Sequence, residues 1–297
     1  MKGRSSVLLL ILGLAPASAC RKSGPDENSA DAYNSRGNAY ASKRELDRAI
    51  ASFDTAIQIR PNFPFAFKNR GVAYSAKDSF DRAIQDLDQA IKLKPDYAGA
   101  FNSRGFAHQL KGEYELAVQD YDKSIALAPE SAPTYRNRAN SRFILGRFGD
   151  AASDLERSVK FRDSTTPPGA RFDETGGYAV VWLHVAKMRD GQDDAKEFAR
   201  YSARIDSSYW PRPVVSFFEG KLTADQLVAQ TATVADPKLR DDQRCGAEFF
   251  AGQAAMWKTQ AAEARKRLET VTTTCSKRFT EHAAALADLA RLGASTK

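Results

Sequence analysis

The hexapeptide NRGVAY at residues 69–74 decides the fold, because altered copies of it recur at a fixed interval on both sides. The upstream copy is SRGNAY at residues 35–40 and the downstream copy is SRGFAH at residues 103–108, each 34 residues away. A constant period of this length predicts one supersecondary unit that is repeated along the chain. Such units stack so that neighbours bury a shared apolar face.

Four units of 34 residues follow from this phrase, and their first residues are Ala30, Pro64, Ala98 and Ala132. Position 4 is aromatic, positions 8 and 20 are small, and position 24 is large and apolar. In unit order these positions hold Tyr33, Phe67, Phe101 and Tyr135; Gly37, Gly71, Gly105 and Ala139; Ala49, Ala83, Ala117 and Ala151; Phe53, Leu87, Tyr121 and Leu155. Position 32 is proline in the first three units, which predicts the end of a helix there.

This pattern is identified as the tetratricopeptide repeat (TPR), in which each unit is an antiparallel pair of helices, A and B. The expected fold is all-α: a helical solenoid, wound as a right-handed superhelix of helix pairs, with four repeats over residues 30–163. The glycine of the opening phrase then lies inside helix A, where it costs about 1 kcal/mol relative to alanine. Close packing of helix A against helix B is the expected compensation.

The arginine of the phrase has an acidic counterpart in every unit. Position 7 is Arg36, Arg70, Arg104 and Arg138, and position 25 is Asp54, Asp88, Asp122 and Glu156. Position 7 of helix A lies opposite position 25 of helix B in an antiparallel pair. The sequence therefore predicts four ion pairs, each within one repeat. The alternative is an arginine ladder that binds an anionic ligand.

Stacked repeats of this family present a concave groove lined by helix A, and the resemblance implies that this groove binds an extended protein segment. The residues expected to line it are Asn34, Asn38, Lys68, Val72, Asn102, Phe106, Gln109, Arg136, Asn140 and Phe143. Amides would meet the partner's backbone, aromatics its side chains, and the two cations would favour an acidic partner. The family's carboxylate clamp is not expected, because Gly99 stands where it needs a basic residue. A groove wall without any ligand is the other interpretation.

The period breaks after residue 163. Residues 164–177, STTPPGARFDETGG, predict a loop, and residues 178–297 a divergent TPR-like helical region. Helices are expected at residues 178–188, 194–205, 214–219 and 223–234, with Thr223 as N-cap of the last. A further unit begins at Cys245, with Gly252, Ala264 and Leu268 at positions 8, 20 and 24, and residues 279–292 predict a terminal capping helix.

Cysteine is rare, with three residues in 297. In the unit that begins at Cys245, Cys245 and Cys275 occupy positions 1 and 31, which lie side by side in a helix hairpin. This placement predicts a disulfide between them, with two free thiols as the alternative.

Residues 1–19 have the three parts of a secretory signal peptide: a positive start, an apolar run at residues 7–14, and small residues before Cys20. The apolar run is too short to span a bilayer. Two routes stay open, namely cleavage to a soluble protein, or lipidation of Cys20 as in a bacterial lipoprotein. Residues 20–29 would be a flexible linker. The expected location is the periplasm, with a lipid anchor at the outer membrane.

The arrangement resembles bacterial outer-membrane TPR lipoproteins that act as adaptors for periplasmic proteases and cell-wall hydrolases. The resemblance rests on the signal with Cys20, the consecutive repeats, the Trp210–Pro211 segment, and the endings CGAEFFAGQ and FTEHAAALADL. It implies a scaffold whose partner is a periplasmic protease or a peptidoglycan hydrolase. A homo-oligomer is left open.

Composition and motifs point away from other classes of function. The formal net charge is +7, but acidic and basic residues are interspersed, so no nucleic-acid partner is expected. His108, His184 and His282 lie in separate helical segments, and no HExxH, GxSxG or phosphate-binding loop is present. The sequence predicts no catalysis, no metal and no cofactor. The alternatives are a soluble periplasmic carrier of small molecules or peptides and, last, a thiol-dependent enzyme using Cys245 or Cys275.

Overall fold

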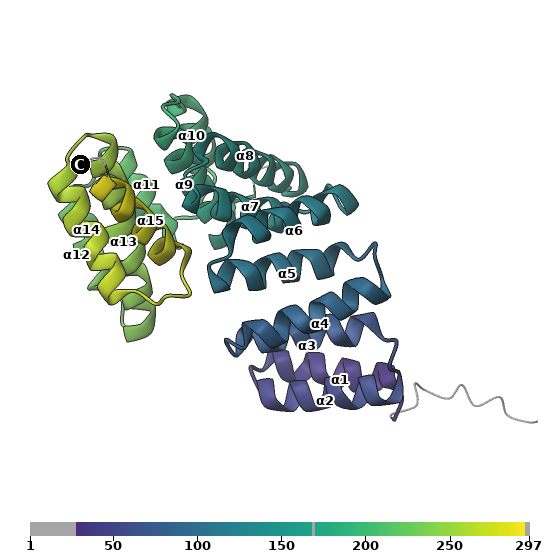
Figure 1. Ribbon diagram of the computed structural model, residues 1–297. Helices are drawn as coiled ribbons and strands as arrows, with labels where there is room; N and C mark the ends of the chain where they lie inside the picture. Colours follow the sequence, from purple (N-terminus) through teal and green to yellow (C-terminus); the bar gives the residue numbers. More distant parts are fainter. Residues whose placement is uncertain (1–27, 168–169, 295–297) are drawn as a thin grey trace, which may run out of the picture.

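The structure, a computed structural model, describes residues 28–167 and 170–294, and over these ranges every regular element is an α-helix. The signal peptide, Cys20 and all but the last two residues of the expected linker lie outside the described residues. Eight consecutive helices form the repeat array (Figure 1). They are α1 (Ala30–Ser42), α2 (Leu46–Ile59), α3 (Pro64–Ala76), α4 (Phe80–Leu93), α5 (Ala98–Lys111), α6 (Tyr114–Leu127), α7 (Ala132–Ile144) and α8 (Phe148–Thr165). The predicted all-α TPR solenoid is confirmed.

Close helix crossings explain the small residues of the repeat. A Cβ atom built on Gly71 of α3 would lie 2.9 Å from Leu87 Cγ and 3.0 Å from the Ala83 carbonyl oxygen of α4. Gly105 of α5 has the same relation to Tyr121 of α6, at 2.9 Å. These contacts leave no room for a side chain, so the cost of a helical glycine is offset by packing.

The turn between helices A and B has one recurring backbone conformation. Position 15 of the unit has a positive φ in all four repeats: Arg44 (62°), Asp78 (58°), Gly112 (86°) and Gly146 (79°). The unit that begins at Cys245 continues this series, because its position 15 is Thr259, with a φ of 57°. The shared left-handed residue supports the sequence register of that last unit.

Proline ends helix B where it was predicted to. Helices α2, α4 and α6 each stop two residues before the proline at position 32, since the residue before a proline disfavours the helical conformation. In the fourth repeat this position is Asp163, and α8 runs on to Thr165. The predicted loop at residues 164–177 is therefore too long. It is also shortened at its far end, where Asp173 caps α9 by accepting a hydrogen bond from Gly176 N at 2.7 Å.

The remaining helices form the divergent C-terminal part. They are α9 (Glu174–Arg189), α10 (Ala195–Ser202), α11 (Pro211–Phe218), α12 (Ala224–Thr231), α13 (Pro237–Trp257), α14 (Ala261–Thr274) and α15 (Thr280–Ala294). Thr223 is the N-cap of α12 within a full capping box, as predicted. Helix α13 begins eight residues before the expected start at Cys245, because Asp236 and Pro237 provide an N-cap and a first-turn proline.

The C-terminal part folds back on the fourth repeat. Helix α15 packs against both α14 and α7 (Figure 1). Asp288 of α15, which is fully buried, accepts hydrogen bonds from Arg189 at 2.9 Å, Gln253 at 2.8 Å and Arg291 at 2.8 Å. Arg291 in turn donates to the carbonyl of Ile144 at the end of α7. One continuous core, running from the fourth repeat through α9 and α13 to α15, results from this packing.

No helix within residues 28–167 and 170–294 has the length and apolar character to cross a membrane.

Candidate partner-binding groove

The A helices α1, α3, α5 and α7 lie next to one another in the array (Figure 1). Positions 5, 9 and 12 of these helices carry the residues that the sequence assigned to a groove. We call the surface formed by positions 5 and 9 the A-helix face.

Two large apolar side chains are exposed on the A-helix face. Val72 of α3 is 43% exposed and Phe106 of α5 is 40% exposed, and both occupy position 9 of neighbouring repeats. Phe65, at position 2 of α3, is 46% exposed. Exposed apolar residues that gather on one face indicate a contact surface more strongly than the same residues scattered singly.

Asparagines connect neighbouring A helices across this face. The Asn69 amide donates to Asn34 Oδ1 at 3.0 Å, and the Asn137 amide donates to Asn102 Oδ1 at 3.4 Å. Asn69 and Asn137, at position 6, thus contact the predicted groove residues Asn34 and Asn102, a contact that the sequence interpretation missed; each pair is 35 residues apart, one more than the period. Asn38 at position 9 of α1 is exposed.

Two cations at position 5 form no ion pair with a described carboxylate, although Asp173 lies near enough to Arg136 to oppose part of the lowering of its pKa. Among the described residues, no carboxylate lies within ion-pair distance of Lys68 or Arg136. Lys68 donates to Asn69 Oδ1 at 3.2 Å. Burial lowers the pKa of Lys68 from its usual value. Burial, followed by the nearby charge of Arg162, lowers the pKa of Arg136. A carboxylate from a partner would relieve both costs.

Arg136 opens onto a small hollow between α7 and α9. The hollow has a volume of about 310 Å³, and its walls include Asn140 of α7 together with Glu174, Tyr178 and Trp182 of α9. The hollow therefore lies between the last repeat and the first helix of the C-terminal part.

Three predicted groove residues have structural partners instead. Phe143 is fully buried, with its ring 5.0 Å from Trp182 and 4.9 Å from Phe148, so its assignment to the groove is wrong. Gln109 accepts hydrogen bonds from Tyr121 at 3.0 Å and Ser141 at 3.1 Å.

Asn140 is the third of these, and it donates to Thr280 Oγ1 of α15 at 3.4 Å. The C-terminal part thus covers the fourth repeat where a partner was expected to lie.

The arginines at position 7 form a ladder, but with a different register from the predicted one. Arg70 binds Asp86 of its own repeat through two hydrogen bonds of 2.7 Å and Asp54 of the preceding repeat at 2.6 Å. Asp88, the predicted partner of Arg70, binds Arg104 of the next repeat at 2.6 Å. The predicted pairing of position 7 with position 25 of the same repeat is therefore wrong for Arg70, because position 25 pairs with the arginine of the next repeat and position 23 supplies the acid within the repeat.

The same bridge recurs along the array. Arg104 joins Asp120 and Asp88, and Arg138 joins Asp154 and Asp122. Position 23, which supplies the acid of the same repeat, was not considered in the sequence interpretation. Hydrogen bonds to these carboxylates raise the pKa of Arg70 and Arg104. These arginines are saturated by two acids each and have little capacity left for an anionic ligand.

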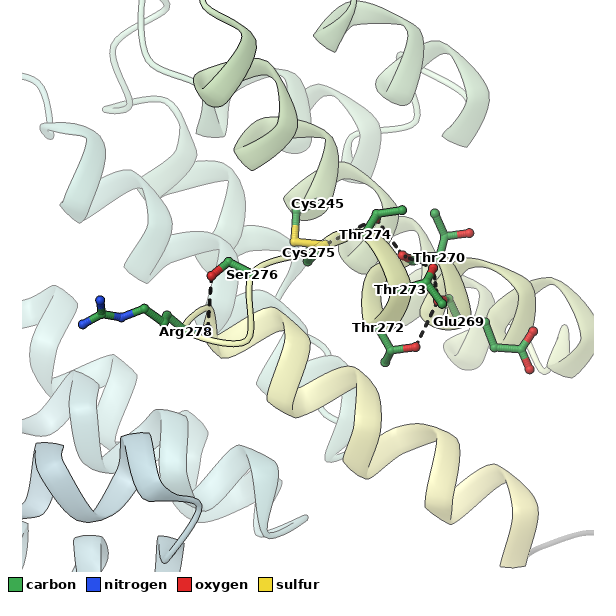
Figure 2. Close-up of a disulfide and its surroundings, with 9 residues drawn as sticks. All are labelled: Cys245, Glu269, Thr270, Thr272, Thr273, Thr274, Cys275, Ser276 and Arg278. Carbon is green, nitrogen blue, oxygen red and sulfur yellow. Dashed lines mark hydrogen bonds between the residues drawn. A yellow bond between two sulfur atoms is a disulfide. The ribbon is translucent and has the colours of Figure 1, made fainter. Parts of the chain in front are cut away.

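The predicted disulfide between Cys245 and Cys275 is confirmed, with a Cα–Cα distance of 5.6 Å (Figure 2). It joins α13 to the residue that follows α14. The histidines stay apart: His108 contacts Glu113 at 2.6 Å, His184 contacts Asp194 at 2.8 Å, and His282 is buried. In the described part of the chain, no group of three or more His, Cys, Asp and Glu side chains could hold a metal ion.

A second hollow, which the sequence did not predict, lies in the C-terminal part and has a volume of about 800 Å³. Its walls include Phe217, Phe218 and Trp257 together with the His184–Asp194 pair. His184 stacks on Phe198 with ring centroids 4.1 Å apart. The hollow is formed by helices that are distant in sequence, so no local sequence pattern predicts it.

Comparisons with known proteins agree on the repeat. Residues 30–63 match the model described as "Tetratricopeptide repeat", residues 76–112 match one described as "TPR repeat", and residues 98–131 match a second "Tetratricopeptide repeat" model. No curated protein sequence matches the chain.

Several solved structures are similar to this chain. The crystal structure of MamA protein is 18% identical, with a TM-score of 0.48, over 66% of this chain and 95% of that chain. YrrB, described as a TPR protein with an unusual peptide-binding site, is 16% identical, with a TM-score of 0.48, over 66% of this chain and 94% of that chain. The first TPR of Spaghetti, solved with an HSP90 peptide, is 26% identical, with a TM-score of 0.38, over 39% of this chain and 95% of that chain.

The 34-residue period, the left-handed residue at position 15 of each unit, and the family models that match within residues 30–131 lead to one conclusion. The chain contains an array of tetratricopeptide repeats within an all-α fold.

Proposed function

We propose that this protein is a protein–protein interaction scaffold without catalytic activity, which binds an extended protein segment on the A-helix face of α1, α3 and α5. The observation that carries the proposal is the combination of exposed Val72 and Phe106 with the cation Lys68, which has no carboxylate partner. The fourth repeat contributes Arg136 at the far end, next to the hollow against α9. The site therefore ends where α15 covers α7.

The partner segment is extended and acidic. Asn34 and Asn102 use one oxygen each within the protein and retain donors for a partner's backbone. Val72 and Phe106 give apolar anchors, and Lys68 and Arg136 attract carboxylates. Anchors of this kind contribute most of the affinity of an interface, whereas the surrounding polar contacts fix its register.

Selection from a displayed random-peptide library on the full mature chain tests this site. Peptides selected on the wild type should lose at least tenfold in affinity, about 1.4 kcal/mol, when Val72 and Phe106 are both changed to alanine. The control is Leu116→Ala, which removes a similarly exposed side chain (45%) from helix B of the third repeat. Equal binding by the double variant and the wild type would exclude the A-helix face as the site.

We propose further that the scaffold works in the bacterial cell envelope, as a periplasmic lipoprotein that brings a protease or a peptidoglycan hydrolase to its substrates. The support is the signal-like start before Cys20 and a disulfide, which suits an oxidising compartment. Labelled palmitate should enter the full-length protein in a bacterial host, and Cys20→Ser should abolish the label. A secreted chain with a free amine at Cys20 would instead favour a soluble protein.

The alternatives differ in what they require. A thiol-dependent enzyme needs a free thiolate, whereas Cys245 and Cys275 are joined in a disulfide. A small-molecule carrier has one observation in its favour, the hollow of about 800 Å³ with aromatic walls, which is within the usual size of ligand pockets. Quenching of Trp257 by an apolar dye at micromolar concentration, with no effect of Val72 and Phe106 substitutions, would favour the carrier.

A further inference from the structure

The loop between α14 and α15 reaches the second repeat. It comprises residues 275–279, and its Arg278 side chain extends away from the disulfide (Figure 2). The guanidinium donates to the carbonyls of Ala76 at 3.4 Å and Ser75 at 3.5 Å, at the end of α3. Ser75 is position 12 of its repeat, on the same stripe of α3 as Lys68 and Val72, and its side chain is buried, so Arg278 meets only its backbone carbonyl.

These contacts are too weak to determine the position of the loop. Both hydrogen bonds are at the upper limit of length, and Asp78 lies 3.6 Å from Arg278 Nε. The side chains of Arg278 and Asp78 are 48% and 57% exposed, and ion pairs so exposed contribute little. A guanidinium has five N–H donors, so Arg278 retains capacity for a further acceptor.

The loop is held instead at both of its ends. On one side Cys275 is bonded to Cys245 of α13. On the other side α15 is fixed by its packing on α7, by the buried Asp288 network, and by Arg291, which donates to the Ile144 carbonyl at the end of α7. The protein therefore supplies a cation to the second repeat from a segment about two hundred residues away.

We propose that Arg278 is a partner-binding residue of the A-helix face, and that the Cys245–Cys275 disulfide positions it there. The inference rests on the proposed peptide-binding function. Where the partner segment crosses α3, it passes Lys68, Val72 and the Ser75 carbonyl that Arg278 contacts; Lys68 and Ser75 are seven residues apart, about 10 Å along the helix. An extended partner covers this distance with about three residues. The groove then favours two acidic residues, about three positions apart, with an apolar residue between them.

The test uses the full mature chain, a random-peptide library and three variants: Arg278→Ala, Lys277→Ala and Lys68→Ala. Peptides selected on the wild type should share the acidic–apolar–acidic spacing, and the Arg278→Ala variant should bind them with about fivefold lower affinity. Lys277→Ala removes the same charge from the same loop, and affinity should stay within twofold. Selection on Arg278→Ala should yield peptides that keep the acid facing Lys68 and lose the second one.

A redox arm tests the role of the disulfide. A reductant should lower the affinity of the wild type for the acidic peptides by about the same factor as Arg278→Ala does. The same reductant should cause little further loss of affinity in the Arg278→Ala variant. If selection on Arg278→Ala yields peptides with the same two acidic residues and unchanged affinity, the inference about Arg278 is wrong, but the proposed peptide-binding function is not contradicted. If no library peptide binds the wild type or any variant, or if changing Val72 and Phe106 to alanine leaves peptide affinity unchanged, the proposed function itself is wrong.

Discussion

At the scale of single residues, Arg70 holds the two helices of its own repeat together and also joins that repeat to the preceding one. Its guanidinium binds Asp86 on helix B of its own repeat and Asp54 on helix B of the preceding one. Its side chain is 20% exposed and that of Asp86 is 9% exposed, so this pair is screened less by solvent than a surface pair. In the second, third and fourth repeats, one arginine thereby connects three helices.

Double-mutant cycles should identify the partners of the ladder. Changing Arg104 and Asp88 to alanine, singly and together, should give a coupling free energy of about 0.5–2 kcal/mol by urea unfolding, because their charged groups are in contact. The same cycle between Arg70 and Asp88 should give a coupling near zero. A larger coupling for Arg70 with Asp88 would restore the register expected from the sequence.

Glu281 should make stability depend on pH. Burial raises the pKa of Glu281 above its usual value. The folded state therefore prefers the neutral carboxyl, and the stability that this form contributes is present below the unfolded pKa of about 4.3 and is lost as pH rises through the folded pKa. Glu281→Gln should stabilise the protein at pH 7 and have a smaller effect at pH 4, as measured by urea unfolding. An equal effect at both pH values would contradict this.

At the scale of helices, the glycine of the opening phrase is a packing residue. Gly71→Ala should destabilise the protein by about 1–2 kcal/mol, because the clash with Leu87 and the Ala83 carbonyl exceeds the gain in helix propensity.

Gly99→Ala is the matched control, since its Cβ would meet only the ring of Tyr97, at 3.3 Å. Its stability should change by less than about 0.5 kcal/mol in thermal or urea unfolding. Equal losses for the two variants would mean that backbone conformation, and not the helix crossing, decides the effect.

Helix α15 depends on one buried carboxylate. Asp288→Ala leaves Arg189 and Gln253 without their acceptor in the interior, so unfolding free energy should fall by about 3–5 kcal/mol. Hydrogen exchange should show lost protection in α15 before other helices. Asp96→Ala, which removes an acid that is 73% exposed, is the control and should change little.

At the scale of the whole molecule, the core is distributed unevenly. The first three repeats contain small separate clusters of buried apolar residues, whereas a single core joins the fourth repeat to α15. Repeat arrays are stabilised by contacts between neighbours, so the N-terminal end is held from one side only.

Unfolding should therefore begin at the N-terminal repeats. Amide hydrogen exchange should give lower opening free energies for α1 to α4 than for α9 and α13. Reduction of Cys245–Cys275 should lower protection in α13 to α15 and leave α1 to α4 unchanged, since the bond closes a separation of 30 residues within the C-terminal part. A single opening free energy for all helices would contradict this order.

The sequence by itself determined the repeat unit, its helix boundaries and its close helix crossings. A period of 34 residues repeats the same neighbour contacts, so the small positions could be assigned to helix crossings and the proline position to the end of helix B from the sequence alone. The disulfide followed in the same way, because positions 1 and 31 of one unit meet in any such hairpin. The arginine register failed because position 7 contacts acids at two positions, 23 and 25, and the period cannot say which repeat supplies each one.

Only the tertiary structure decided which segments that are distant in sequence contact one another. Phe143 occupies a helix A position that looked open, and it is buried because α9 covers it through Trp182. Asn140 and the end of α3 acquire neighbours from α15 and from Arg278, more than one hundred residues away. Such contacts depend on the angle at which the C-terminal part returns to the array. That angle results from packing the whole core, and no periodic pattern in the sequence encodes it.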